Sequence, residues 1–198
     1  NQQMRNMRVM YETNDPISMV RAELEGMYQD DPVAFEESFY LSMHQMQLSQ
    51  SRRAVEYEQA GRSANAKLAN ERAVAAQAEM DLLRSRVMDK GVSKNPGIFA
   101  IQFEEALQDA KWDMASKLVE FGTQENIDEA GGQLLVARYR LARHVEAREA
   151  GDMESAREFA AQAALAARQA TEISTWSDAA WLALGMSLEA AGNEDEAM

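Results

Sequence analysis

A turn residue followed by alanine five positions later constrains the fold of this chain more than any other feature. The motif occurs four times: Gly61 with Ala66, Ala110 with Ala115, Gly151 with Ala156, and Gly192 with Ala197. The last three turns are evenly spaced, 41 residues apart (151 − 110 and 192 − 151). Glycine ends helices because it adopts a positive φ without steric cost. The pattern predicts helical hairpins whose turns lie within about three residues of these positions and whose alanines are buried against the preceding helix.

The composition indicates an all-α fold. Only 3 Pro and 10 Gly interrupt the 198 residues, of which 46% are apolar and 27% are charged. These proportions are typical of a globular chain rather than a disordered one. The commonest residue types, among them Ala, Glu, Gln and Arg, are all compatible with helix.

An N-terminal segment, residues 1–31, is expected to contain one short helix. Asp15 followed by Pro16 supplies a side-chain cap and then proline at the first helical position, which is a helix start. This start predicts a helix over about residues 16–29.

Residues 32–91 are expected to form a long helical hairpin. Asp31 and Pro32 repeat the same start signal, and no Pro or Gly follows before Gly61. A second long helix is expected over about 63–90. One very long helix that tolerates Gly61 is the alternative, and the recurrence of the turn motif favours the hairpin.

The second long helix carries an apolar pattern with a period of seven. Leu68, Ala75 and Leu82 recur on one helical face, with Ala64 and Ala78 beside them. The spacing indicates that these residues form the apolar face of the helix.

The stretch from Trp181 to Ala197 resembles a tetratricopeptide (TPR) repeat. The matching residues are Trp181, Leu184, Gly185, Leu188, Gly192 and Ala197. The resemblance implies an α-solenoid of stacked hairpins over residues 92–198, with the last repeat cut short at Met198. It also implies that Trp181, Leu184 and Leu188 are buried against the third repeat or another chain.

The other repeats depart from the TPR pattern. Their period of about 41 exceeds the TPR value of about 34 and lies in the range of other helical repeats. Arg143 and His144 stand where the family has leucine and glycine. The repeat is therefore TPR-like and irregular.

Charge and composition exclude several classes of function. The net charge of −13 repels phosphate backbones, so nucleic acid is not an expected partner. The chain has no Cys, which removes disulfides and thiolate chemistry. No stretch approaches the roughly 18 apolar residues of a membrane span, and no signal peptide is visible. The compartment is not predicted.

No pattern of catalytic, cofactor-binding or metal-binding residues is found. His44 and His144 are the only histidines, and neither has a glutamate three residues before it. His144 is expected to be solvated among Arg and Glu. His44 is expected to pack near an apolar stripe formed by Phe35, Phe39, Met43 and Met46. The three tryptophans are expected to pack in the core and between repeats: Trp112, Trp176 and Trp181. We therefore expect a protein that is not an enzyme and has no cofactor.

The TPR resemblance also implies a partner-binding face on the first helix of each pair. Residues spaced i, i+3, i+7 and i+10 lie on one side of such a helix. The candidate partner-binding residues are Arg138, Leu141, Val145 and Arg148, extended in the last repeat by Leu182 and Met186. An apolar pair between two arginines suits a peptide with an acidic residue at each end. The alternative is that Leu141 and Val145 are core and that the arginines pair with nearby glutamates.

The resulting hypothesis is a helical-repeat scaffold or adaptor that binds a protein or peptide partner. The alternative is a structural component of a large assembly, such as a phage virion, an internal or ejection protein, or a secretion apparatus. In that case copies of the chain would pack through the long helices of residues 32–91. A more distant possibility is an enzyme, or a nucleic-acid binder that acts through Arg138, Arg140 and Arg143.

Overall fold

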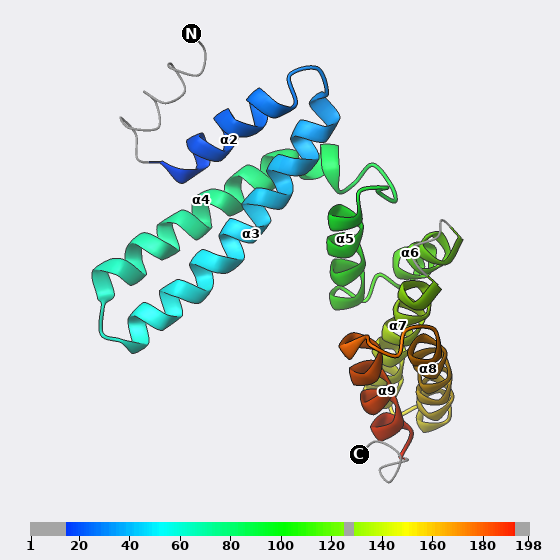
Figure 1. The fold of residues 1–198 in the computed structure, drawn as a ribbon. Coiled ribbons are helices and arrows are strands. Elements are labelled where there is room, and N and C mark those ends of the chain that lie inside the picture. Colours follow the sequence, from blue (N-terminus) through cyan, green and yellow to red (C-terminus); the bar gives the residue numbers. More distant parts are fainter. Residues whose placement is uncertain (1–14, 125–128, 193–198) are drawn as a thin grey trace. The chain divides into compact units, whose positions relative to one another are not determined.

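The computed structural model describes residues 15–124 and 129–192, and this part of the chain is all helical (Figure 1). The chain divides into two compact units, residues 1–99 and 100–198, and each is described by itself. Ala197, the fourth alanine of the turn motif, lies outside the described residues.

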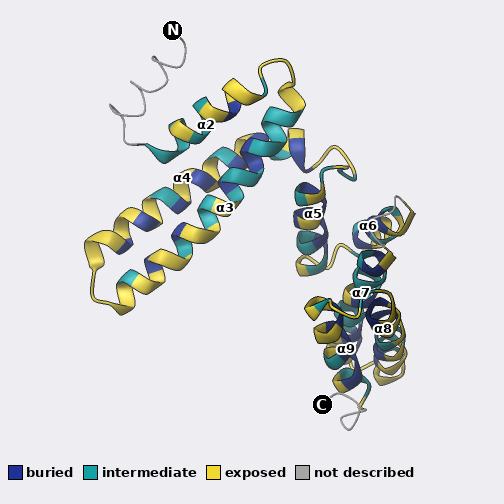
Figure 2. Cartoon of the chain, viewed as in Figure 1, coloured by how far each residue is buried: buried dark blue, intermediate teal, exposed yellow. Residues whose placement is uncertain are grey.

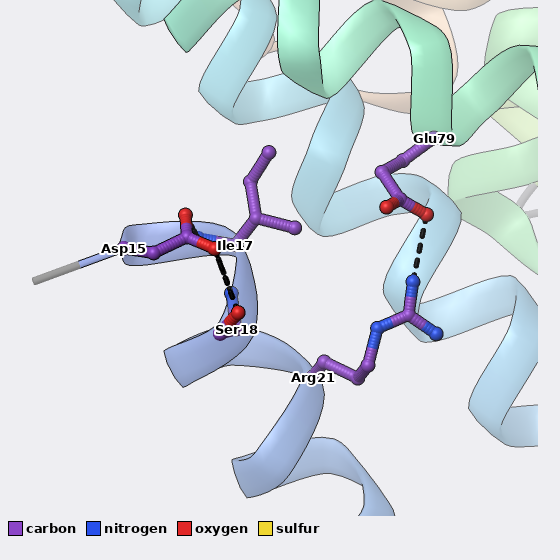
Figure 3. Close-up of polar contacts among 5 residues, drawn as sticks. All are labelled: Asp15, Ile17, Ser18, Arg21 and Glu79. Carbon is purple, nitrogen blue, oxygen red and sulfur yellow. Dashed lines mark hydrogen bonds and ion pairs between the residues drawn. The ribbon is translucent and has the colours of Figure 1, made fainter. Parts of the chain in front are cut away.

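The first unit begins with α2 (Pro16–Met27), the short helix that the sequence predicts. The carboxylate of Asp15 accepts hydrogen bonds from the backbone amides of Ile17 and Ser18 and from the Ser18 hydroxyl, at 2.6 Å for the hydroxyl (Figure 3). The hydroxyl bond, joined by the two amide bonds and the charge of Arg72, holds the pKa of Asp15 below its ordinary value of 3.8.

Two long helices, α3 (Pro32–Gln59) and α4 (Ser63–Val87), pack side by side as an antiparallel hairpin (Figure 1). Gly61 lies between them with φ = 69°. The predicted hairpin is therefore present, rather than one long helix. The buried residues of α4 alternate in steps of three and four: Ala66, Ala69, Ala73, Ala76, Met80, Leu83 and Val87. This 3–4 spacing is that of a two-stranded coiled coil.

The predicted apolar face of α4 is not its core face. Leu68 and Leu82 are 48% and 70% exposed, and Ala75 is exposed between them. Figure 2 shows exposed residues running along the whole of α4. The helix carries two apolar stripes, and α3 packs against the one that runs from Ala66 to Val87. Leu68 and Leu82 are left on the outside.

Helix α2 packs on α3 and is tied to α4 by an ion pair. Nη2 of Arg21 lies 2.7 Å from Oε2 of Glu79 (Figure 3), and the guanidinium lies over the ring of Phe39 at 4.5 Å. Phe39 is almost fully buried, so the stem and head group of Arg21 close one side of this core.

The second unit contains α6 (Trp112–Gln124), α7 (Glu129–Glu149), α8 (Met153–Ile173) and α9 (Asp178–Ala191). It also contains most of α5 (Pro96–Gln108), which begins in the first unit. Each helix from α6 onwards packs against the next, and α7 also packs against α9. The shared core of α7, α8 and α9 is formed by Ala137, Ala166, Ala167, Ala183, Leu184 and Leu188.

Three turns of the chain have the same backbone hydrogen bonds. At Gly151, the amide of Gly151 donates to the carbonyl of Arg148 at 3.1 Å, and the amide of Asp152 donates to Ala147 at 2.9 Å. The same pair of bonds occurs around Gly61 and Ala110. Two such bonds around a left-handed residue define the Schellman motif.

The predicted turn positions are confirmed. The four turn residues all have positive φ: Gly61, Ala110, Gly151 and Gly192. The alanines five residues beyond the first three turns are buried, each at most 1% exposed: Ala66, Ala115 and Ala156. The recurrence in the sequence therefore corresponds to a recurring backbone structure.

His144 is buried, so the expectation that it is solvated is wrong. The side chain is 7% exposed, and its Nδ1 lies 2.9 Å from the carbonyl oxygen of Ala156. His144 therefore lies on the face of α7 that packs against α8. Its ring joins α7 to the first turn of α8.

Candidate partner-binding surface

The candidate surface lies on α7 and α9, two helices that pack against each other in the second unit. Ala137 of α7 and Leu184 and Leu188 of α9 face their common core. The burial of Leu184 and Leu188 confirms the prediction for these two residues. Each helix then has another side that the core does not cover.

On α7, the predicted residues form a partly exposed face. Val145 is 49% exposed and Arg148 is exposed, whereas Leu141 is half-buried. Val145 is therefore not an ordinary core residue. Arg148 forms no ion pair within the part of the chain that the structure describes.

Arg138, the fourth predicted residue of α7, is already engaged. Its guanidinium pairs with the carboxylate of Glu104 on α5 and lies 5.7 Å from the ring centroid of Phe103. The alternative that this arginine pairs with a nearby glutamate is correct. Arg138 thus links α5 to α7, and Arg148 is the cation of this face that has no such partner among the described residues.

On α9, the predicted residues are strongly exposed. Leu182 and Met186 are 66% and 52% exposed, and their i, i+4 spacing places them on one face. Exposed side chains of this size remain accessible to a partner. Single exposed apolar residues are common, so the significance lies in the pair together with Val145 on the adjacent helix.

Two of the three tryptophans are exposed, which the sequence does not predict. Trp176 is almost fully exposed, and Trp181 is 53% exposed with its Nε1–H donating to the carbonyl oxygen of Thr175 at 3.0 Å. The expectation that both pack in the core is wrong. The sequence around Trp176 does indicate an exposed turn, because Ser174, Thr175 and Ser177 are residue types common in turns and helix caps.

A separate polar and aromatic cluster ties α6 to α7 and α8. Trp112 donates its Nε1–H to Oε1 of Glu146 at 2.5 Å, and Glu146 Oε2 lies 2.9 Å from Nε of Arg143. The Arg143 guanidinium lies 5.1 Å from the ring centroids of both Trp112 and Phe159. Arg140 lies over Phe159 as well, at 5.8 Å. These two arginines contribute to packing between helices.

Among the described residues, no group of three or more His, Asp or Glu side chains is arranged to hold a metal ion. No helix of the described part is long and apolar enough to cross a bilayer.

Comparison of the chain with protein-family models, with curated proteins and with solved structures finds no match. Function is therefore inferred from the residues and surfaces of the chain itself.

Proposed function

We propose that this protein is a non-enzymatic helical scaffold that binds a protein or peptide partner through the outer face of α7 and α9. The observation that carries the proposal is the exposure of Leu182 and Met186 on α9 and of Val145 on α7, two helices that pack against each other. Apolar groups gathered on adjacent helices are typical of a surface that a partner covers.

The recurring turn supports a TPR-like arrangement of the second unit. In such an arrangement α5, α7 and α9 are the first helices of successive pairs, and α6 and α8 are the second helices. First helices line a continuous binding surface in helical repeat proteins. The ion pair between Glu104 on α5 and Arg138 on α7 links two of these first helices.

The chemistry of the face defines a partner segment. Val145, Leu182 and Met186 suit an apolar centre, because methionine adapts its shape to different ligands. Arg148 suits a carboxylate at one end of that centre, since a guanidinium can hold a carboxylate with two hydrogen bonds. Arg138 already pairs with Glu104, so it is less available to bind a second carboxylate of the partner. We therefore expect one acidic end rather than two.

Peptides selected from a display library on the purified chain test this proposal. The double variant Leu182→Asp and Met186→Asp is expected to weaken the selected peptides at least about tenfold, because buried anchors dominate binding energy. Leu165→Asp is the matched control, since Leu165 is 62% exposed on α8. Equal binding to the double variant and to the control, measured by calorimetry, would contradict the proposed face.

The second candidate function, a component of an assembly, is favoured by a different observation. The α3–α4 hairpin exposes apolar side chains along its length, including Leu48, Val55, Val74 and Leu82. These residues belong to the first unit, whereas the residues of the proposed partner-binding face belong to the second.

A further inference from the structure

Helix α4 has a second apolar stripe that its own chain does not cover. One stripe, from Ala66 to Val87, is buried against α3. The other is exposed and has the seven-residue spacing of a coiled-coil seam: Ala64, Leu68, Ala75, Ala78 and Leu82. A helix that packs with only one neighbour needs only one stripe, so the second indicates another helix.

We propose that the exposed stripe of α4 binds the same stripe of a second copy, in an antiparallel pair with its two-fold axis at Ala75. Leu68 and Leu82 are equally distant from Ala75, seven residues on either side. In this register Leu68 of one copy lies opposite Leu82 of the other at both ends, and the small alanines meet in the middle. A surface that is complementary to itself in this way is the requirement for a two-fold dimer.

The charges beside the stripe favour this pairing. In the antiparallel register Lys67 of one copy comes within two residues of the position opposite Asp81 of the other, and the two-fold axis repeats the pair. On the other side of the stripe, Glu79 already pairs with Arg21 of its own chain, so Lys67 and Asp81 supply the attraction between the copies. Lys67 and Asp81 are both exposed. A parallel pair in register would instead place Lys67 near Arg72 of the second copy, where like charges repel.

The exposed stripe of α4 includes one acidic residue, Glu71. Oε1 of Glu71 lies 3.9 Å from Nζ of Lys67 on the same helix, and this lysine offsets its negative charge. An open groove of about 600 Å³ is lined chiefly by α4 residues and includes Val74, Ala75 and Ala78. The small side chains along this groove leave room for side chains from an approaching helix.

A single introduced cysteine tests the register directly, because the chain contains none. Ala75→Cys places two thiols at the two-fold axis and is expected to give a disulfide-linked dimer under mild oxidation. Gln77→Cys is the control, since Gln77 is also exposed but lies about 200° around the helix from Ala75. Equal crosslinking of both variants, or of neither, would overturn the register.

Charge exchange tests the partner. Lys67→Asp alone and Asp81→Lys alone each bring like charges together at both ends of the dimer, and each is expected to weaken association at least about tenfold. A one-to-one mixture of the two variants restores both attractive pairs, so dimers are expected to return in analytical ultracentrifugation. A mixture that stays as weak as its components would contradict a symmetric α4 pair.

The oligomeric state of the unaltered chain gives the final criterion. A dimer that dissociates in the double variant Leu68→Asp and Leu82→Asp is expected, and circular dichroism checks that the helices remain folded. A chain that is monomeric at high micromolar concentration, or a dimer that this variant leaves intact, would overturn the proposal. Peptide binding through α7 and α9 is measured separately on the same variant, so the two proposals can fail independently.

Discussion

Gly151 shows how a single backbone angle determines which residue a turn accepts. Its φ is 78°, and no heavy atom lies within 4 Å of the place where a Cβ would stand. Any cost of substitution therefore comes from the backbone conformation rather than from a clash. We expect Gly151→Val to lower the free energy of unfolding by roughly 1–3 kcal/mol, because a β-branched residue is strained at positive φ.

Ala110 lies in another turn of the same type and allows the opposite substitution. It is the one residue other than glycine with positive φ in the described part of the chain, at 53°, and it has the same hydrogen bonds as Gly151. Ala110→Gly is expected to change stability in the opposite direction, by up to about 1 kcal/mol. Urea unfolding of both variants measures the two effects, and a loss of stability in Ala110→Gly would refute the common explanation.

At the scale of the helix, the turns could be predicted from sequence and the packing face of α4 could not. A turn is a local structure, and Gly61 or Gly151 signals it without reference to the rest of the chain. The packing face depends on which stripe another helix covers. α4 offers two stripes of similar apolarity, and only the position of α3 distinguishes Ala76 from Ala75.

The other wrong expectations also concern burial, which depends on the position of other parts of the chain. His144 has charged neighbours in the sequence, yet its place on α7 turns it towards α8. Trp176 is a residue type that is usually buried, yet it lies in the short α8–α9 turn. For the candidate surface, Leu182 and Met186 are exposed, and their part in binding a partner stays a prediction. The partner of Arg138, Glu104, lies on a helix that the sequence alone does not place beside α7.

Adjacent alanines of α4 give a direct test of its two faces. Ala76 is fully buried and Ala75 is exposed. Ala76→Leu is expected to lower the free energy of unfolding by about 1–3 kcal/mol, because the added methylenes must fit between α3 and α4. Ala75→Leu, measured at a dilute concentration, is expected to change it by less than about 0.5 kcal/mol. A larger loss in Ala75→Leu than in Ala76→Leu would reverse the assignment of the core face.

For the whole molecule, the division into two compact units makes a prediction about how the chain unfolds. Each unit has its own core, which includes Met43 in the first and Ala137 in the second. All three tryptophans lie in the second unit, so tryptophan fluorescence reports that unit, whereas circular dichroism reports the helices of both. The two signals can therefore distinguish independent unfolding from cooperative unfolding.

Met43→Ala removes a fully buried side chain between the long helices of the first unit. We expect it to destabilise that unit by about 2–5 kcal/mol through lost burial and a residual cavity. The circular dichroism transition should then move to lower temperature or split in two, and the fluorescence transition should stay where it is. If the fluorescence transition moves by the same amount, the two units unfold together. In that case α5, which runs through the boundary at residues 99 and 100, is the continuous element through which unfolding would pass from one core to the other.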